Sequence, residues 1–179
     1  MLDEFSGLDY SVVGGVATRS YQPERFTKDL DLLVSAAQID LVRKRLHEHG
    51  FEKVGGLTFP DSALGLDGET WQRGAEAPLG IMRSSQVWAT AAISGARPDA
   101  QGLPIVSLAH LILMKLDASR GVDQGDLSRM LGLADDASLE NVRAVIAALL
   151  PDAVEDLEHY IELGRFEVGR AAAHRPEHR

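Results

Sequence analysis

The hydrophobic and polar positions of the N-terminal half form short runs that predict strands and helices separated by polar turns. Tyr10–Val13 is a brief β-type run that ends at the pair Gly14-Gly15. Asp29–Val34 (DLDLLV) alternates and then turns apolar, as a strand does when it enters a core. Between these two strands the pattern predicts a short helix over Val16–Tyr21 and a loop over Gln22–Lys28.

A helix is predicted over Ala36–His49, with Ser35 as its N-cap and Gly50 as its C-terminal stop. Trp88–Ile93 fits either a helix or a strand. Further strands are predicted over Phe51–Val54, Leu57–Phe59, Thr70–Arg73, Leu79–Met82 and Leu103–Val106.

From Ser107 onward the pattern changes to helical periodicity. Helices are predicted over 107–120, Asp123–Leu131, Ser138–Leu150 and Asp152–Leu163, with Pro151 between the last two. The predicted fold class is α/β (α+β), with an α/β core over residues 1–106 and a helical C-terminal region over 107–170 packed on it. Residues 171–179 are polar and are expected to fray.

The composition narrows the classes of function. Eighteen Lys and Arg stand against 27 Asp and Glu, so the net charge of −9 disfavours broad electrostatic DNA binding. Cysteine is absent, which excludes disulfides and thiolate sites. No apolar stretch approaches the roughly 20 residues that span a bilayer, and no secretion signal is recognised at the start. A cytoplasmic protein without a membrane partner is therefore expected.

Two carboxylates, Asp29 and Asp31, stand at the polar start of an otherwise apolar predicted strand. Residues i and i+2 of a strand point to the same face, so both side chains can reach one divalent cation. Mg²⁺ accepts a few carboxylate oxygens and completes its shell with water and substrate phosphates. The upstream Gly14-Gly15 pair lets backbone amides approach a polyphosphate closely. The alternatives are an acidic pair that only solvates the strand start, and glycines that form an ordinary turn.

These residues also carry a family resemblance. VVGG-V-A (12–17) followed by R-F-T-K-D-L-D-L-L-V (25–34) resembles the signature of the nucleotidyltransferase superfamily, the DNA polymerase β-like fold. LPIVSLAHLILMKLDASRGVDQGDLSRML (103–131) resembles the helical block of its small bacterial toxin-like branch, the AbiEii type. The resemblance covers roughly residues 8–35 and 103–131, with a vaguer match between them.

The resemblance implies a small mixed sheet flanked by helices, and transfer of a nucleotidyl group from an NTP to an RNA, protein or small-molecule acceptor. It implies Asp29 and Asp31 as ligands of Mg²⁺ or Mn²⁺, and Gly14 and Gly15 as the cradle of the β- and γ-phosphates. A toxin with a cognate antitoxin partner is the biological setting that it suggests.

The resemblance extends to residues outside the aspartate pair. It implies that Lys115 contacts phosphate or substrate and that Asp126 helps to place it. Thr27 belongs to the loop motif of the family, and by charge Arg25 and Lys28 add phosphate contacts. From the residues alone, three alternatives stay open: a Lys115–Asp126 bridge between helices, an exposed Lys115 head group, and an N-cap role for Asp123.

One departure from the family pattern affects catalysis. The third carboxylate of the family stands on a later strand, and the best alignment puts Gly80 in its place. The acids Asp67, Glu69 and Glu76 lie nearby in sequence as possible substitutes. The resulting alternative is a weakened or inactive relative that serves as a nucleotide-binding or protein-interaction module.

Overall fold

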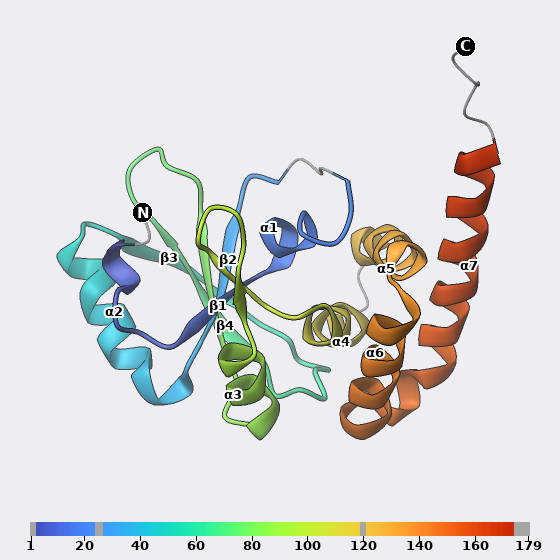
Figure 1. Cartoon of the computed structure of the whole chain (residues 1–179). Coiled ribbons are helices and arrows are strands. Elements are labelled where there is room, and N and C mark those ends of the chain that lie inside the picture. Colours follow the sequence, from blue (N-terminus) through green and yellow to red (C-terminus); the bar gives the residue numbers. More distant parts are fainter. Residues whose placement is uncertain (1–2, 24–26, 119–120, 174–179) are drawn as a thin grey trace, which may run out of the picture. The chain divides into compact units, whose positions relative to one another are not determined.

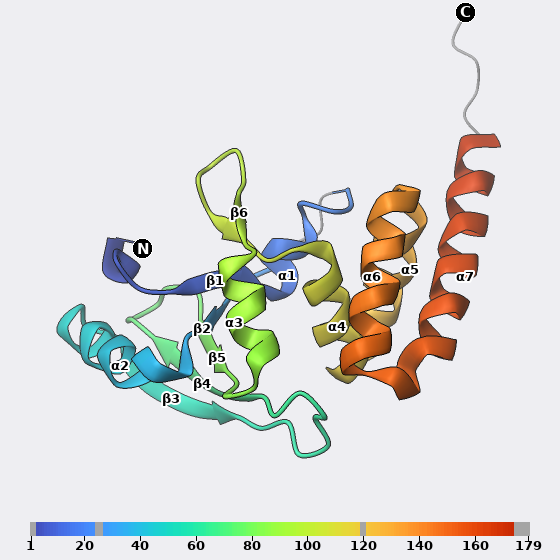
Figure 2. The ribbon, with the colours of Figure 1, turned by 60° about the horizontal axis from the view of Figure 1, so that its bottom comes forward.

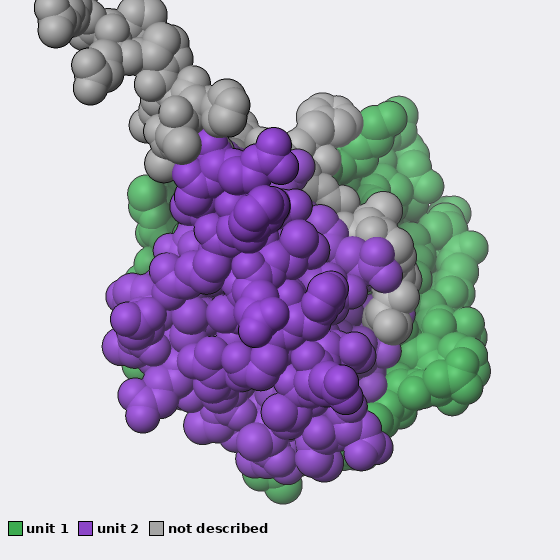
Figure 3. Space-filling view, turned by 90° about the vertical axis from the view of Figure 1, so that its right-hand side faces the viewer, with its two compact units in different colours: residues 1–20, 24–107 green, residues 21–23, 108–179 purple. Residues whose placement is uncertain are grey.

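The computed structural model describes residues 3–23, 27–118 and 121–173. The chain forms two compact units, coloured separately in Figure 3. Unit 1 comprises residues 1–20 and 24–107, and unit 2 comprises residues 21–23 and 108–179. Among the described residues, no helix is long and apolar enough to cross a membrane.

Unit 1 is built on a sheet (Figure 1). Its described strands follow the order β3-β4-β5-β2-β1-β7-β6. β2 is parallel to β5 and antiparallel to β1, while β1 is parallel to β7. Val12, Leu32 and Ile81 on the central strands are buried, so the core lies along these strands. The strands are β1 Tyr10–Val13, β2 Leu30–Val34, β3 Glu52–Leu57, β4 Asp67–Gln72, β5 Leu79–Arg83, β6 Arg97–Pro98 and β7 Pro104–Ile105.

Helix α2 covers the part of the sheet that carries Trp71. Val42 and Leu46 of α2 are buried one helical turn apart, and the His47 ring meets the Trp71 ring edge-on with centroids 4.9 Å apart. Gly50 ends the helix with a φ of +79°, a conformation that favours glycine. The helical segments of unit 1 are η1 Asp3–Phe5, α1 Gly14–Thr18, η2 Ala36–Gln38, α2 Ile39–Glu48 and α3 Val87–Ser94.

Several predicted elements need correction. The Ser35 side chain makes no capping hydrogen bond, and the helix opens as the 3₁₀ segment η2, whose Gln38 amide instead binds Asp9. The separate strand predicted at Leu57–Phe59 is wrong, because β3 runs to Leu57 through a bulge and two glycines. The ambiguous segment after Gln86 is the helix α3, and the two-residue strand β6 was not predicted.

Unit 2 is helical, as predicted for this part of the chain (Figure 2). Its core consists of apolar side chains from successive helices, including Ile112, Met130, Val142 and Ile161. The helices are α4 Leu108–Ala118, α5 Gly121–Leu133, α6 Asp136–Leu149, η3 Pro151–Ala153 and α7 Val154–Ala173. The mixed sheet with helices and the helical C-terminal region confirm the predicted α/β class. Residues 174–179 of the tail that is expected to fray lie outside the described residues.

Helices α5 and α7 lie side by side at unusually short range (Figure 1, Figure 2). Gly132 of α5 faces Gly164 of α7, and a Cβ at Gly132 would overlap the Gly164 backbone. A Cβ at Gly164 would overlap the carbonyl oxygen of Ser128. Because backbone atoms cannot rotate away, the two glycines set the spacing of these helices.

Gly132→Ala is therefore expected to lower the free energy of unfolding by about 1–3 kcal/mol, since the methyl group forces the helices apart. Gly125→Ala is the matched control, because Gly125 lies on the same helix with open space around it. That variant is expected to gain up to about 1 kcal/mol from helix propensity. Urea unfolding followed by circular dichroism measures both, and equal stabilities would contradict the close contact.

Candidate functional site

The end of β1 and the start of β2 meet in unit 1, because the two strands pair antiparallel. Val13 pairs with Asp31, and the chain turns directly afterwards at Gly14. Gly14 has a φ of +62°, so the turn itself calls for glycine. The buried Thr18 hydroxyl donates a hydrogen bond of 2.9 Å to the carbonyl oxygen of Gly14 and fastens this turn from the end of α1.

The Asp31 carboxylate lies between two glycines. A Cβ at Gly14 would overlap one carboxylate oxygen of Asp31, and a Cβ at Gly80 would overlap the other. Gly80 is the partner of Asp31 across the parallel pair β2–β5. Since side chains at either position would displace this carboxylate, the glycines set where it lies. Asp31 itself is half-buried.

Thr27 lies against the second glycine of the same turn. A Cβ at Gly15 would come within 2.6 Å of the Thr27 hydroxyl oxygen, so the second glycine is also in close contact. The Thr27 hydroxyl donates to the carbonyl oxygen of Asp29 at 3.4 Å. Asp29 directly precedes β2, and its side chain and that of Lys28 are exposed.

The structure thus brings Gly14, Asp31 and Gly80 together, and it places Gly15 against Thr27. Arg25 lies outside the described residues. Thr18 was not among the predicted site residues, because a threonine in the turn after two glycines carries no distinctive signal of its own.

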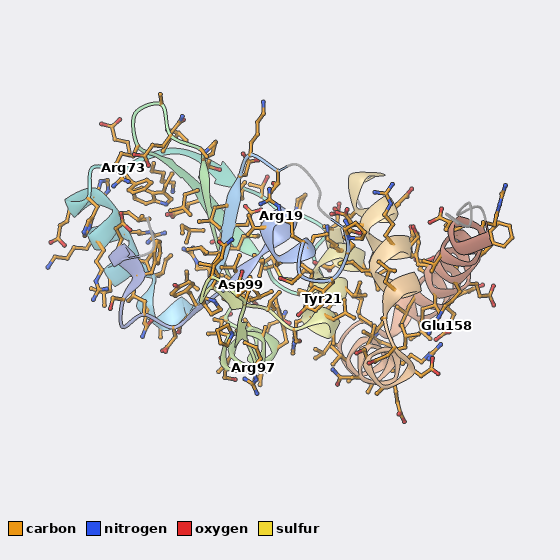
Figure 4. All side chains as sticks on the ribbon, turned by 45° about the horizontal axis from the view of Figure 1, so that its top comes forward. Arg19, Tyr21, Arg73, Arg97, Asp99 and Glu158 are labelled. Carbon is orange, nitrogen blue, oxygen red and sulfur yellow. The ribbon has the colours of Figure 1, made fainter. Side chains whose placement is uncertain are left out.

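None of the proposed substitutes for the third carboxylate shares the face of Asp31. Asp31 pairs with Gly80 on β5, and Gly80 in turn pairs with Thr70 on β4, so these three residues lie side by side on one face of the sheet. Asp67 and Glu69 alternate with Thr70 along β4 and therefore point to the opposite face of the sheet. Glu76 pairs with Arg73 in the turn after β4 (Arg73 is labelled in Figure 4).

Glu69 has a separate role on its own face. Its side chain is 3% exposed and accepts hydrogen bonds from Arg43, from Lys53 at 3.0 Å and from the Trp71 indole at 3.2 Å. Hydrogen bonds from Arg43 lower the pKa of Glu69 to about 2, against the opposing effect of burial. This carboxylate therefore stabilises the fold on the α2 side of the sheet.

The low pKa predicts how stability depends on pH. Because folding lowers the pKa of Glu69 from 4.5 to about 2, its contribution is fully present above pH 4.5 and is lost as pH falls toward 2. The contribution is on the order of 3 kcal/mol. Glu69→Gln is expected to remove most of this dependence in urea titrations at about pH 6 and about pH 3. Glu48→Gln, at an exposed i,i+4 pair with Lys44, is the control and should keep it.

Lys115 and Asp126 form part of a buried cluster in unit 2. The Lys115 ammonium group donates hydrogen bonds of 2.7 Å to Asp123 and 2.7 Å to Asp126, and all three residues are at most 5% exposed. Lys115 is therefore not an exposed head group at a helix edge. Asp123 lies inside α5 and is not its N-cap. The bridge between helices α4 and α5 is present, and the substrate contact implied for Lys115 and Asp126 stays a prediction.

The donor set at the start of β2 fits a divalent cation that is shared with a substrate. Among the described residues, no group of three or more His, Cys, Asp or Glu side chains could hold a metal ion alone. Mg²⁺ needs no such group, since one or two carboxylates with water and substrate phosphates suffice. The role of Asp29 and Asp31 as these ligands stays a prediction.

Comparison with known proteins gives matches among solved structures only. No family model and no curated protein matches the chain. The solution structure of the antibiotic-resistance factor ANT(2'')-Ia aligns at 16% identity and a TM-score of 0.46, over 97% of this chain and 92% of that one. The crystal structure of ANT(2'')-Ia with adenylyl-2''-tobramycin aligns at 18% and 0.48, over 90% of each chain.

Terminal uridylyl transferase 4 from Trypanosoma brucei with bound GTP aligns at 11% identity and a TM-score of 0.32, over 84% of this chain and 47% of that one. These neighbours are nucleotidyltransferases. At such identities and TM-scores, none of them transfers its activity or the roles of its residues to this chain. Function is inferred from the residues at the start of β2.

Proposed function

We propose that the chain is a metal-dependent nucleotidyltransferase that moves a nucleotidyl group from an NTP to a hydroxyl of an RNA, protein or small-molecule acceptor. One observation carries the proposal: the Asp31 carboxylate lies between Gly14 and Gly80, where β2 begins beside the glycine turn. The lack of side chains at Gly14 and Gly80 lets this carboxylate lie against the turn. A carboxylate fixed at the end of a strand suits a cation that is shared with a polyphosphate.

Asp29 and Asp31 would hold Mg²⁺ or Mn²⁺, which when bound neutralises phosphate charge and polarises the reacting phosphoryl group. The glycine turn would contribute backbone amides to the phosphates. Lys28, exposed and adjacent to Asp29, adds positive charge for the triphosphate, and Thr27 holds the loop against Gly15. Arg25 is proposed in the same role as Lys28.

In the reaction, an acceptor oxygen forms a bond to the α-phosphorus of the NTP while the bond from that phosphorus to the bridging oxygen breaks. Pyrophosphate leaves, and the proton of the acceptor hydroxyl passes to solvent water. Asp31, as a residue that would hold the cation, would help to orient the α-phosphate for in-line attack. A general base for this proton is lacking at the place that the family resemblance gives to a third carboxylate. Gly80 on β5 and Thr70 on β4 are the residues paired in line with Asp31 there.

This shortage of acids supports a second candidate, a nucleotide-binding or protein-interaction module without catalysis. The two are separated by incubating the protein with an NTP labelled at the α-phosphate, Mg²⁺ and a mixture of RNA, protein and small-molecule extracts. An enzyme transfers label to an acceptor, and EDTA stops the transfer. A binding module gains thermal stability from Mg²⁺ and a non-hydrolysable NTP but transfers nothing. The absence of both responses would reject both proposals.

Gly80 offers a direct test of the carboxylate position. Gly80→Ala is expected to weaken binding of Mg²⁺ with a non-hydrolysable NTP by about 10-fold, since the methyl group displaces the Asp31 carboxylate. Gly55→Ala on the edge strand β3 is the matched control, because a Cβ there meets nothing within 4 Å. Isothermal titration calorimetry compares the variants. Equal affinity in Gly80→Ala would show that the position of this carboxylate does not matter.

The biological setting is proposed from the sequence resemblance to the AbiEii type: a cytoplasmic toxin restrained by a cognate antitoxin. Induced expression in a bacterial host is expected to arrest growth, and Asp31→Asn is expected to relieve the arrest. Growth arrest by both forms would separate toxicity from nucleotidyl transfer.

A further inference from the structure

The segment 21–23 belongs to unit 2, although the residues on both sides of it belong to unit 1. It is also part of the connection between α1, which begins with the two glycines, and β2, at whose start the two aspartates lie. The chain therefore leaves the α/β unit and returns to it between the two halves of the candidate site.

Side-chain contacts hold this segment in the helical unit. Gln22 is 7% exposed, and its amide nitrogen donates a hydrogen bond of 3.1 Å to Asp126, 104 residues further along the chain. Tyr21, labelled in Figure 4, hydrogen-bonds the backbone of Leu108 at the start of α4. The segment is thus attached at consecutive residues to α4 and α5.

The acceptor of the Gln22 amide is a charged cluster. Lys115 donates hydrogen bonds to the carboxylates of Asp123 and Asp126 through its ammonium group. The Gln22 amide adds a donor to one of these carboxylates, and a hydrogen bond to a buried carboxylate is among the stronger kinds. A carboxylate in place of the Gln22 amide would be repelled by Asp126 at the same distance.

We propose that Gln22 is a positioning residue, through which the Lys115–Asp123–Asp126 cluster of unit 2 fixes the segment between the glycine turn and the aspartates. The consequence for nucleotide binding rests on the proposed function, whereas the attachment of the segment does not.

Gln22→Glu tests the attachment with almost no change of volume. Trypsin cleavage after Arg19 and after Lys28, two exposed residues that flank the segment, is expected to become about 10-fold faster. Gln38→Glu is the matched control, since Gln38 also donates to an aspartate, Asp9, but on the surface and outside this segment. Its cleavage pattern should equal that of the wild type, and mass spectrometry identifies the sites.

The exchange of the two groups supplies a rescue. In Gln22→Glu combined with Asp126→Asn, the amide and the carboxylate trade places and the net charge is restored, so cleavage is expected to return close to the wild-type rate. Gln22→Ala, which removes the donor without adding charge, gives the same measurement should Gln22→Glu fail to fold. Unchanged cleavage in the single variants, or no rescue in the exchanged pair, would overturn the proposal.

The positioning role of Gln22 is tested by the affinity for Mg²⁺ with a non-hydrolysable NTP. This affinity would not change if Gln22 only attached the segment. Gln22→Glu is expected to bind about 10-fold more weakly than wild type at equal melting temperature, and the exchanged pair is expected to recover. Faster cleavage with unchanged affinity would overturn the positioning role. A wild-type protein without nucleotide affinity would overturn the proposed function, while the cleavage experiment would still decide the attachment.

Discussion

Replacement of Asp31 by asparagine is expected to lower the proposed nucleotidyl transfer by about 10²–10³-fold, since it removes a charge that is proposed to hold the cation at the phosphates. Asparagine has nearly the shape of aspartate, so it keeps its place between Gly14 and Gly80. The melting temperature is therefore expected to stay close to that of the wild type. Transfer is measured from an NTP labelled at the α-phosphate, at saturating Mg²⁺ and NTP.

The control for this experiment is Asp61→Asn, an exposed aspartate in the connection between β3 and β4. It makes the same chemical change and is expected to leave the rate unaltered. Asp29→Asn should act like Asp31→Asn on the rate, because both carboxylates are proposed to hold the same cation. A rate that survives either site substitution would contradict the shared metal site.

The two strands that carry the site were predictable because their signals are local. Tyr10–Val13 coincides with β1, and the predicted strand Asp29–Val34 differs from β2 only at its first residue. An apolar run that ends in two glycines, and a polar start followed by a buried run, define both boundaries without tertiary information. The same locality explains why the glycine turn was recognised from the sequence.

The environment of the Asp31 carboxylate was not predictable, since it depends on strand pairing. Gly80 was identified from the sequence as the place of a missing acid. The strand register shows that Gly80 of β5 is also the residue paired with Asp31, and its lack of a side chain makes room for the Asp31 carboxylate. A new acid at position 80 would consequently meet Asp31 itself. Sequence periodicity contains no information about which residues of two distant strands lie opposite each other.

The same limit applies to the acids that were considered as substitutes. Glu69 was close enough in sequence to replace the missing carboxylate. It is adjacent to Thr70 on β4, however, so its side chain points to the opposite face of the sheet, toward Arg43. The bond between Gln22 and Asp126 joins residues separated by 104 positions. Neither residue type is unusual at its position, so only the packing of α4 and α5 reveals the contact.

Lys115→Met is expected to destabilise the protein by about 3–5 kcal/mol, because it removes the ammonium group that donates to the buried carboxylates of Asp123 and Asp126. Methionine fills nearly the same volume, so the loss comes from charge and not from a cavity. Lys44→Met is the matched control, since the Lys44 side chain is 70% exposed and pairs with Glu48 at 3.8 Å. That variant is expected to change stability by less than about 0.5 kcal/mol. Urea unfolding at neutral pH measures both.

The partners of Lys115 separate the structural role from the substrate contact that the sequence resemblance implies. Combining Lys115→Met with Asp123→Asn and Asp126→Asn removes the buried charges together, and most of the lost stability is expected to return. A phosphate contact from the ammonium group would not return with it. If stability recovers while nucleotide affinity stays low, Lys115 serves both roles. If stability and affinity recover together, the bridge between α4 and α5 accounts for the residue. A wild-type stability in Lys115→Met alone would contradict the buried ion cluster itself.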